Sequence, residues 1–138
     1  MTELAHSIPQ RDEILSQRVA TASGGAYRIH SARAVDRLKQ YGFSQEEIYR
    51  LVAPRRTLAR RLQANEPLTI QENDSLLRVE RIAAHSRRVF GDEVKAERWL
   101  RKPCRALEGV APIELLPSES GALLVEQELN RIEHGIFL

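Results

Sequence analysis

The sequence lacks several features that would define its class at once. Its 138 residues include a single cysteine, Cys104, so no internal disulfide can form, which fits a reducing compartment. We interpret Cys104 as a small residue at a helix end rather than as a catalytic thiol. No stretch approaches the roughly 20 apolar residues that a membrane span needs. The N-terminus has no long apolar run behind basic residues, so we expect no secretory signal.

Sites for chemistry are also missing from the sequence. None of the four histidines lies three or four residues from another, which with one cysteine argues against a metal site. There is no glycine-rich phosphate loop, and no set of nucleophile, base and acid can be nominated. Trp99 fits a helical core better than a stacking platform. We therefore expect a binding protein without a cofactor or a metal, rather than an enzyme.

Charge is abundant and unevenly distributed. The formal net charge is only +2, yet residues 28–61 contain nine Lys/Arg and three acids, whereas residues 108–138 contain six Glu and one Arg. The first region should attract a polyanion and the second should repel it. Two regions with opposite charge balance indicate two partners of different chemistry.

Apolar residues recur every three or four positions, and Pro and Gly interrupt the pattern, which predicts an all-α fold. Residues 1–26 are weakly periodic and are interpreted as a flexible arm with a short helix around 11–19. The other predicted helices are 31–41, 44–52, 54–64, 70–90, 92–101, 112–116 and 118–133. The residues predicted to face the core are Val35, Leu38, Ile48, Leu51, Val52, Leu58, Leu62, Leu76, Val79, Ala83, Ser86, Phe90, Trp99, Leu100, Ala122, Val125, Leu129 and Ile132.

Four arginines and no acid lie in residues 53–62. The short helices 44–52 and 54–64, with their tight joint and the helix before them, form a helix-turn-helix pattern. If Leu58 and Leu62 are the buried pair, Arg56, Thr57 and Arg60 point outward, where arginine can donate to guanine or to phosphates. Ser44 and Glu47 form a capping box, and that helix start suits a phosphate. The alternative is a solvated basic face. The candidate DNA-binding residues are Ser44, Gln45, Arg50, Arg55, Arg56, Thr57, Arg60 and Arg61.

The run Arg56-Thr-Leu-Ala-Arg-Arg61 resembles a motif of antitoxins in the MbcA/ParS/Xre group. The resemblance extends over about residues 30–138, and several separated motifs agree in order and spacing. These are Arg98-Trp-Leu-Arg-Lys-Pro103, Ala106-Leu-Glu-Gly109, Ala111-Pro-Ile-Glu-Leu-Leu116, Gly121, Val125 and Leu129-Asn-Arg-Ile-Glu-His-Gly135.

This resemblance implies the antitoxin half of a type II toxin–antitoxin pair in the bacterial cytoplasm. The implied partner is a RES-type toxin, a class that resembles ADP-ribosyltransferases and consumes NAD. A Cro/Xre-like helix-turn-helix would bind the operator of the pair's own operon, and the antitoxin would form a homodimer within the toxin complex. The implied organisation is an arm (1–26), a helix-turn-helix domain (27–67) and a helical toxin-binding domain (68–138). The alternative is a stand-alone transcriptional regulator whose C-terminal half dimerises.

The last three residues, Ile136-Phe-Leu138, are apolar and follow a helix stop. Either they fold back on their own core or, as the resemblance implies, they enter the mouth of the toxin's active site. Glu126, Glu128 and Glu133 would then meet a basic rim around the NAD pocket. Arg131 belongs to this tail motif, or it pairs with Glu128 or Glu133 on its own helix. The candidate toxin-binding residues are Arg131, Glu133, Gly135, Ile136, Phe137 and Leu138.

Overall fold

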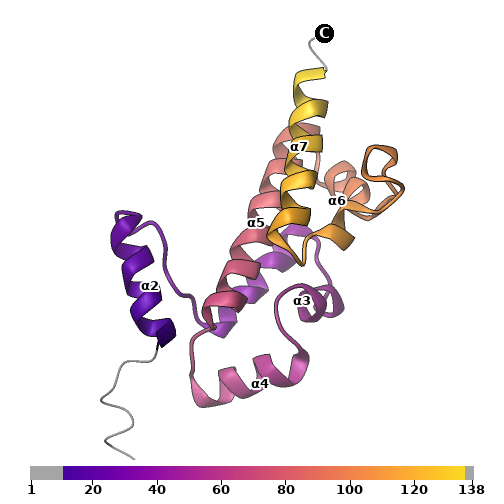
Figure 1. Cartoon of the computed structure of the whole chain (residues 1–138). Coiled ribbons are helices and arrows are strands. Elements are labelled where there is room, and N and C mark those ends of the chain that lie inside the picture. The colour runs from indigo at the N-terminus through magenta and orange to yellow at the C-terminus, as the bar shows by residue number, and fades with distance from the viewer. Residues whose placement is uncertain (1–10, 136–138) are drawn as a thin grey trace, which may run out of the picture.

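The computed structural model describes residues 11–135, and every regular element in that range is a helix (Figure 1). The all-α prediction is therefore confirmed. None of the described helices is long and apolar enough to cross a membrane. The elements are α2 (Arg11–Ala22), the 3-10 helix η1 (Ala32–Tyr41), α3 (Gln45–Leu51), α4 (Arg55–Ala64), α5 (Ile70–Phe90), α6 (Glu93–Arg101), the short 3-10 helices η2 (Arg105–Leu107) and η3 (Pro112–Leu115), and α7 (Glu119–Gly135).

The long helix α5 is the axis of the molecule. It packs against η1, α3, α6 and α7, and hydrogen bonds at Asn73, Glu80 and Arg87 place the segment from His30 through η1 along most of its length. Figure 1 shows α4 at the end of the molecule opposite the C-terminal end of α7, while α2 stands apart from the other helices. The helix expected around residues 11–19 is thus present and longer than predicted, although none of its residues is buried.

One hydrophobic core joins the two halves of the chain. It runs without a break from Ala32 in η1, through Leu58 and Leu76, to Leu129 in α7. Trp99 packs against this core, and its ring lies 5.5 Å from that of Phe90, as expected for a structural tryptophan. The core therefore crosses the boundary expected at residues 67–68.

Local chemistry fixes the helix ends. Gly42 ends η1 in the left-handed region, with φ of 86°, and its amide donates to the last turn. Ser44 and Glu47 form the expected capping box at α3, and Thr69 and Glu72 form a second one at α5. η1 is a 3-10 helix rather than an α-helix, and its buried residues Ala32, Val35 and Leu38 repeat every third position, which matches three residues per turn.

The prediction that Leu62 is buried beside Leu58 is wrong. Leu62 is 47% exposed, whereas Leu58 is 3% exposed. Leu58 is the single buried residue of α4, so this helix reaches the core at one point and its next turn lies outside it.

The start of α7 depends on a buried arginine and a glycine. Arg78 of α5 donates to the carbonyl oxygens of Leu116 (2.8 Å) and Pro117 (3.0 Å), which satisfies the carbonyls between η3 and α7. A Cβ atom on Gly121 would lie 2.0 Å from the carbonyl oxygen of Leu115. Glycine is therefore required for the first turn of α7 to approach η3.

Arg101 ties the C-terminal half to the start of α3. Its guanidinium donates to both carboxylate oxygens of Glu47, at 3.0 and 2.8 Å, and to the carbonyl oxygen of Gly42. Burial acts to raise the pKa of Glu47, but the hydrogen bonds from Arg101 and Ser44 outweigh it, and the pKa lies below its ordinary value of 4.5. Glu47 thus serves the capping box and the link to α6 at once.

This link makes stability depend on pH. Glu47→Gln keeps a capping-box side chain but removes the charge, so we expect the free energy of unfolding at pH 7 to fall by about 1 kcal/mol. Because the folded-state pKa is lowered, the contribution of Glu47 is complete above pH 4.5 and is lost as pH falls through the folded value. Urea unfolding from pH 7 to 3 should therefore show the two proteins converging in acid. Glu46→Gln, at an exposed neighbour, is the control, and parallel pH curves for wild type and Glu47→Gln would contradict the assignment.

Candidate functional site

The outer side of α4 presents unpaired positive charge. Arg55, Arg56 and Arg60 are exposed, α4 contains no acidic residue, and none of the ion pairs within residues 11–135 uses these three arginines. Arg56 and Arg60 are four positions apart and therefore share a face of the helix. Thr57 is half-buried between this face and Leu58. This side of α4 can hold an anion without first breaking a contact.

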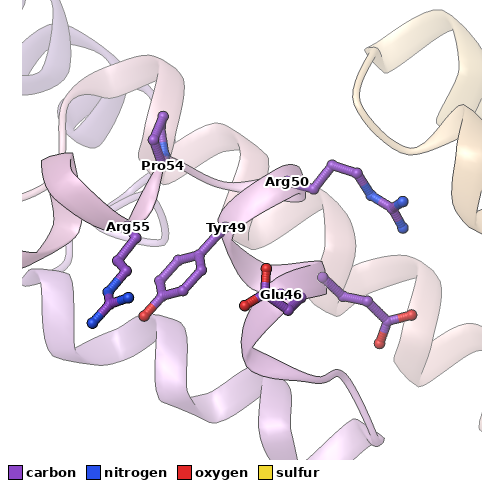
Figure 2. Close-up of a pocket in the computed structure, with 6 residues that line it drawn as sticks. Glu46, Tyr49, Arg50, Pro54 and Arg55 are labelled. Atoms are coloured by element: carbon purple, nitrogen blue, oxygen red, sulfur yellow. The ribbon is translucent and has the colours of Figure 1, made fainter.

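The joint between α3 and α4 is three residues long and forms an open pocket of about 630 Å³. Glu46, Tyr49, Arg50 and Arg55 line it, and Figure 2 shows the polar ends of Tyr49 and Arg55 on the same side. Arg50 points away from them in Figure 2, and it lies 3.9 Å from Glu114 of η3. Arg50 and Arg55 therefore line the same pocket but point their guanidiniums in different directions.

Arg61 differs from the other arginines of its run. It is 13% exposed, and it donates to both carboxylate oxygens of Glu72, at 2.7 and 3.1 Å, and to Glu66 at 3.3 Å. The hydrogen bond to Glu72 is the main cause of a raised pKa at Arg61. Since Glu72 also caps α5, Arg61 fixes the end of α4 to the start of α5 and neutralises two acids beside the basic face.

Ser44 and Gln45 stand at the start of α3, as predicted, but their surroundings are acidic. The Ser44 hydroxyl oxygen accepts from the Glu47 amide at 3.1 Å, and the Ser44 amide donates to Glu47 at 2.9 Å. Glu46 is exposed next to them. The Ser44 hydroxyl and the amides of Ser44 and Glu47 are therefore already engaged within the protein.

The C-terminal candidates lie on the last turns of α7. Arg131 donates to Glu128 on its own helix, at 2.9 and 2.5 Å, and this hydrogen bond raises its pKa. The interpretation of Arg131 as the partner of a neighbouring glutamate thus holds for Glu128. Glu133 lies 3.7 Å from His85, and Gly135 ends the helix. The predicted tail residues Ile136, Phe137 and Leu138 lie outside the described residues.

The acids of α7 are less available than predicted. Glu126 accepts from Arg81 of α5 at 2.8 Å, and Glu128 is buried and paired with Arg131. Of the three glutamates expected to meet a basic rim, Glu133 remains half exposed. In contrast, Leu123 and Leu124 are 51% and 49% exposed, although no sequence argument selected them. The sequence feature that could have indicated this exposure is an apolar pair outside the core-facing stripe of Ala122, Val125 and Leu129.

Within residues 11–135 the molecule is thus a helical protein with a basic face on α4 and a separate, partly apolar face on α7. Residues 85–135 match the family described as the antitoxin Xre/MbcA/ParS C-terminal toxin-binding domain. The antitoxin Xre of Photorhabdus laumondii is 35% identical over 105 residues, which are 74% of this chain and 71% of the relative. The chain belongs to the Xre/MbcA/ParS family of antitoxins.

Two further relatives are similar over shorter stretches. The antitoxin Xre of Pseudomonas putida is 39% identical over 84 residues, and the match spans 61% of this chain and about half, 53%, of the relative. A Sphingobium protein named Prs ADP-ribosylating antitoxin is 26% identical over 90 residues, or 59% of this chain and 57% of the relative.

The contacts of Arg61 predict a role in holding α4. Arg61→Ala should leave Glu72 without its partner and loosen the end of α4, so that amide hydrogen exchange in α4 becomes on the order of tenfold faster. Arg60→Ala, which removes an exposed and unpaired guanidinium from the same helix, is the matched control and should leave exchange unchanged. Equal exchange rates in the two variants would show that Arg61 does not hold α4 in place.

Proposed function

We propose that the chain neutralises a toxin encoded beside it and represses the promoter of their shared operon. The observation that carries this proposal is the spatial separation of the basic α4 face from the part of the chain that matches a toxin-binding domain. Both activities are binding, and we assign no chemistry to the chain itself. NAD turnover by the purified protein alone would contradict that assignment.

The arrangement of α4 supports DNA binding in the manner of a helix-turn-helix. Leu58 anchors the helix in the core, and Arg56 and Arg60 extend from the solvent-exposed side of the same helix. An α-helix fits the major groove, where arginine donates to guanine or to phosphates. Arg61 contributes by position: its ion pair with Glu72 fixes the helix and keeps two carboxylates from repelling the phosphate backbone.

The proposed toxin is of the RES type, which consumes NAD. Support comes from the resemblance in the C-terminal motifs and from the relative whose name couples ADP-ribosylation with an antitoxin. In this proposal the end of α7 leads residues 136–138 into the mouth of the toxin's active site. The complex forms in the bacterial cytoplasm.

The proposal also includes a homodimer, because two copies of a helix-turn-helix match the two half-sites of a palindromic operator. The side chains of Ile14, Leu15 and Val19 on α2 are 40%, 48% and 38% exposed, which gives a second copy an apolar face to cover. A stand-alone regulator is the second candidate, since the basic face alone would serve it equally well. A stable complex on co-expression with the product of the neighbouring gene favours the antitoxin.

Removal of residues 136–138 tests the role of the tail. The truncated protein should bind the toxin at least about tenfold more weakly, because apolar anchors that fill a pocket carry much of an interface's affinity. Its affinity for the operator should stay unchanged, which controls for folding. If the truncated protein rescued cells from the toxin as well as the full chain does, the tail would not act in neutralisation.

The double variant Arg56→Ala/Arg60→Ala tests the basic face. We expect it to lose operator binding in a fluorescence anisotropy titration while it still binds the toxin. Loss of phosphate contacts would also lower the salt slope by about 0.9 per contact, whereas loss at particular base pairs would mark base readout.

Arg88→Ala/Arg98→Ala removes the same charge from exposed arginines outside α4 and should keep operator affinity close to that of the wild type. Equal operator affinities for both double variants would show that the basic face of α4 is only solvated and does not bind the operator.

A further inference from the structure

The helix α7 has a second apolar face besides the one that packs on α5. Ala122, Val125 and Leu129 are fully buried, yet Leu123 and Leu124 between them are about half exposed, at 51% and 49%. Of the described elements, α5, η3 and η2 pack against α7, and in Figure 1 no described helix lies over the side of α7 that faces the viewer. Two adjacent leucines are therefore left open on an otherwise well-packed helix.

Helix geometry extends this face toward the C-terminus. Leu124, Gln127 and Arg131 are three and four positions apart, and Leu123 shares a row with Gln127 and Asn130. All of these residues are exposed. We call Leu123, Leu124, Gln127 and Asn130 the outer face of α7.

The outer face carries almost no free charge. Glu119 and Glu126 of α7 turn toward Arg81 of α5, each at 2.8 Å, and Arg131 at the edge is held by Glu128. The outer face therefore consists of two leucine side chains followed by the side-chain amides of Gln127 and Asn130. Exposed apolar side chains with hydrogen-bonding neighbours and little charge are typical of the centre of a protein–protein interface, and they do not suit a polyanion such as DNA.

We propose that the outer face of α7 is the surface on which the body of the toxin docks, with Leu123 and Leu124 as its apolar anchor. The inference rests on the proposed function and adds a second contact to it. Leu123 and Leu124 lie within the residues that match a toxin-binding domain, and the outer face leads along the same helix to Gly135, where the proposed active-site tail begins.

The spacing supports contact at two points. Leu123 and Gly135 are twelve positions apart in α7, which at about 1.5 Å per residue is about 18 Å. The leucines thus lie too far from Gly135 to share one pocket with the end of α7. They contact the surface of the toxin beside its active site, so that α7 lies against the toxin over most of its length.

The test measures binding of the purified full-length chain to the purified product of the neighbouring toxin gene by biolayer interferometry. Leu123→Asp/Leu124→Asp should weaken the complex by at least about a hundredfold, and Leu123→Ala/Leu124→Ala, which preserves helix propensity, by about tenfold. The matched control is Val94→Asp, because Val94 is 57% exposed in the same matched region but lies on α6. Operator affinity and circular dichroism report that each variant is folded.

The outcomes distinguish this inference from the proposed function. Loss of toxin affinity in both leucine variants, with Val94→Asp close to the wild type, supports the docking face. Unchanged affinity of the leucine variants overturns it and leaves the antitoxin function standing. A change in the mass of the free chain with unchanged toxin affinity also overturns it, because the face would then bind a second copy. If the wild-type chain itself fails to bind the toxin, the proposed function fails, and this inference with it.

Discussion

The burial of α5 between the two halves of the chain is the constraint on which the rest of the molecule depends. Leu76, Val79 and Ile82 are fully buried and belong to a core that includes Leu58 of α4 and Leu129 of α7. The bidentate bond from Arg101 to Glu47 joins the same two halves at the edge of that core. A close-packed interior does not deform gradually. The basic face and the outer face of α7 are therefore held at a fixed distance and cannot be treated as independent domains on a linker.

Ion pairing decides which of the many arginines remain available. The chain has 21 basic and 19 acidic residues, so net charge alone says little about partners. Carboxylates engage Arg61, Arg81 and Arg101, and Arg78 is held by backbone carbonyls and by Glu119. Arg55, Arg56 and Arg60, which form no ion pair within residues 11–135, lie together on the exposed side of α4. The contacts within the fold thus turn a nearly neutral composition into a local basic surface.

Much of this organisation could be predicted from the sequence where the signal is local. The caps at Gly42, Ser44 and Gly91 depend on neighbouring residues, and those helix ends were predicted within one or two positions. Features that depend on distant parts of the chain were not. Periodicity indicates that Leu62 is buried, but the placement of α4 leaves it 47% exposed among the described residues. The sequence does not distinguish Arg61 from its neighbours, because its partner Glu72 lies eleven residues later in the chain. Nor does it show Leu123 and Leu124 as a surface, because their exposure depends on how α7 packs against the distant α5.

The central claim is that one rigid body carries two unlike surfaces far enough apart to be used at the same time. The most direct measurement is size-exclusion chromatography with light scattering on the chain mixed with its toxin and its operator DNA. The account predicts a single species whose mass requires all three components, with the protein binding DNA through α4 and toxin through α7. Displacement of the DNA by the toxin, with no ternary species at any ratio, would contradict it.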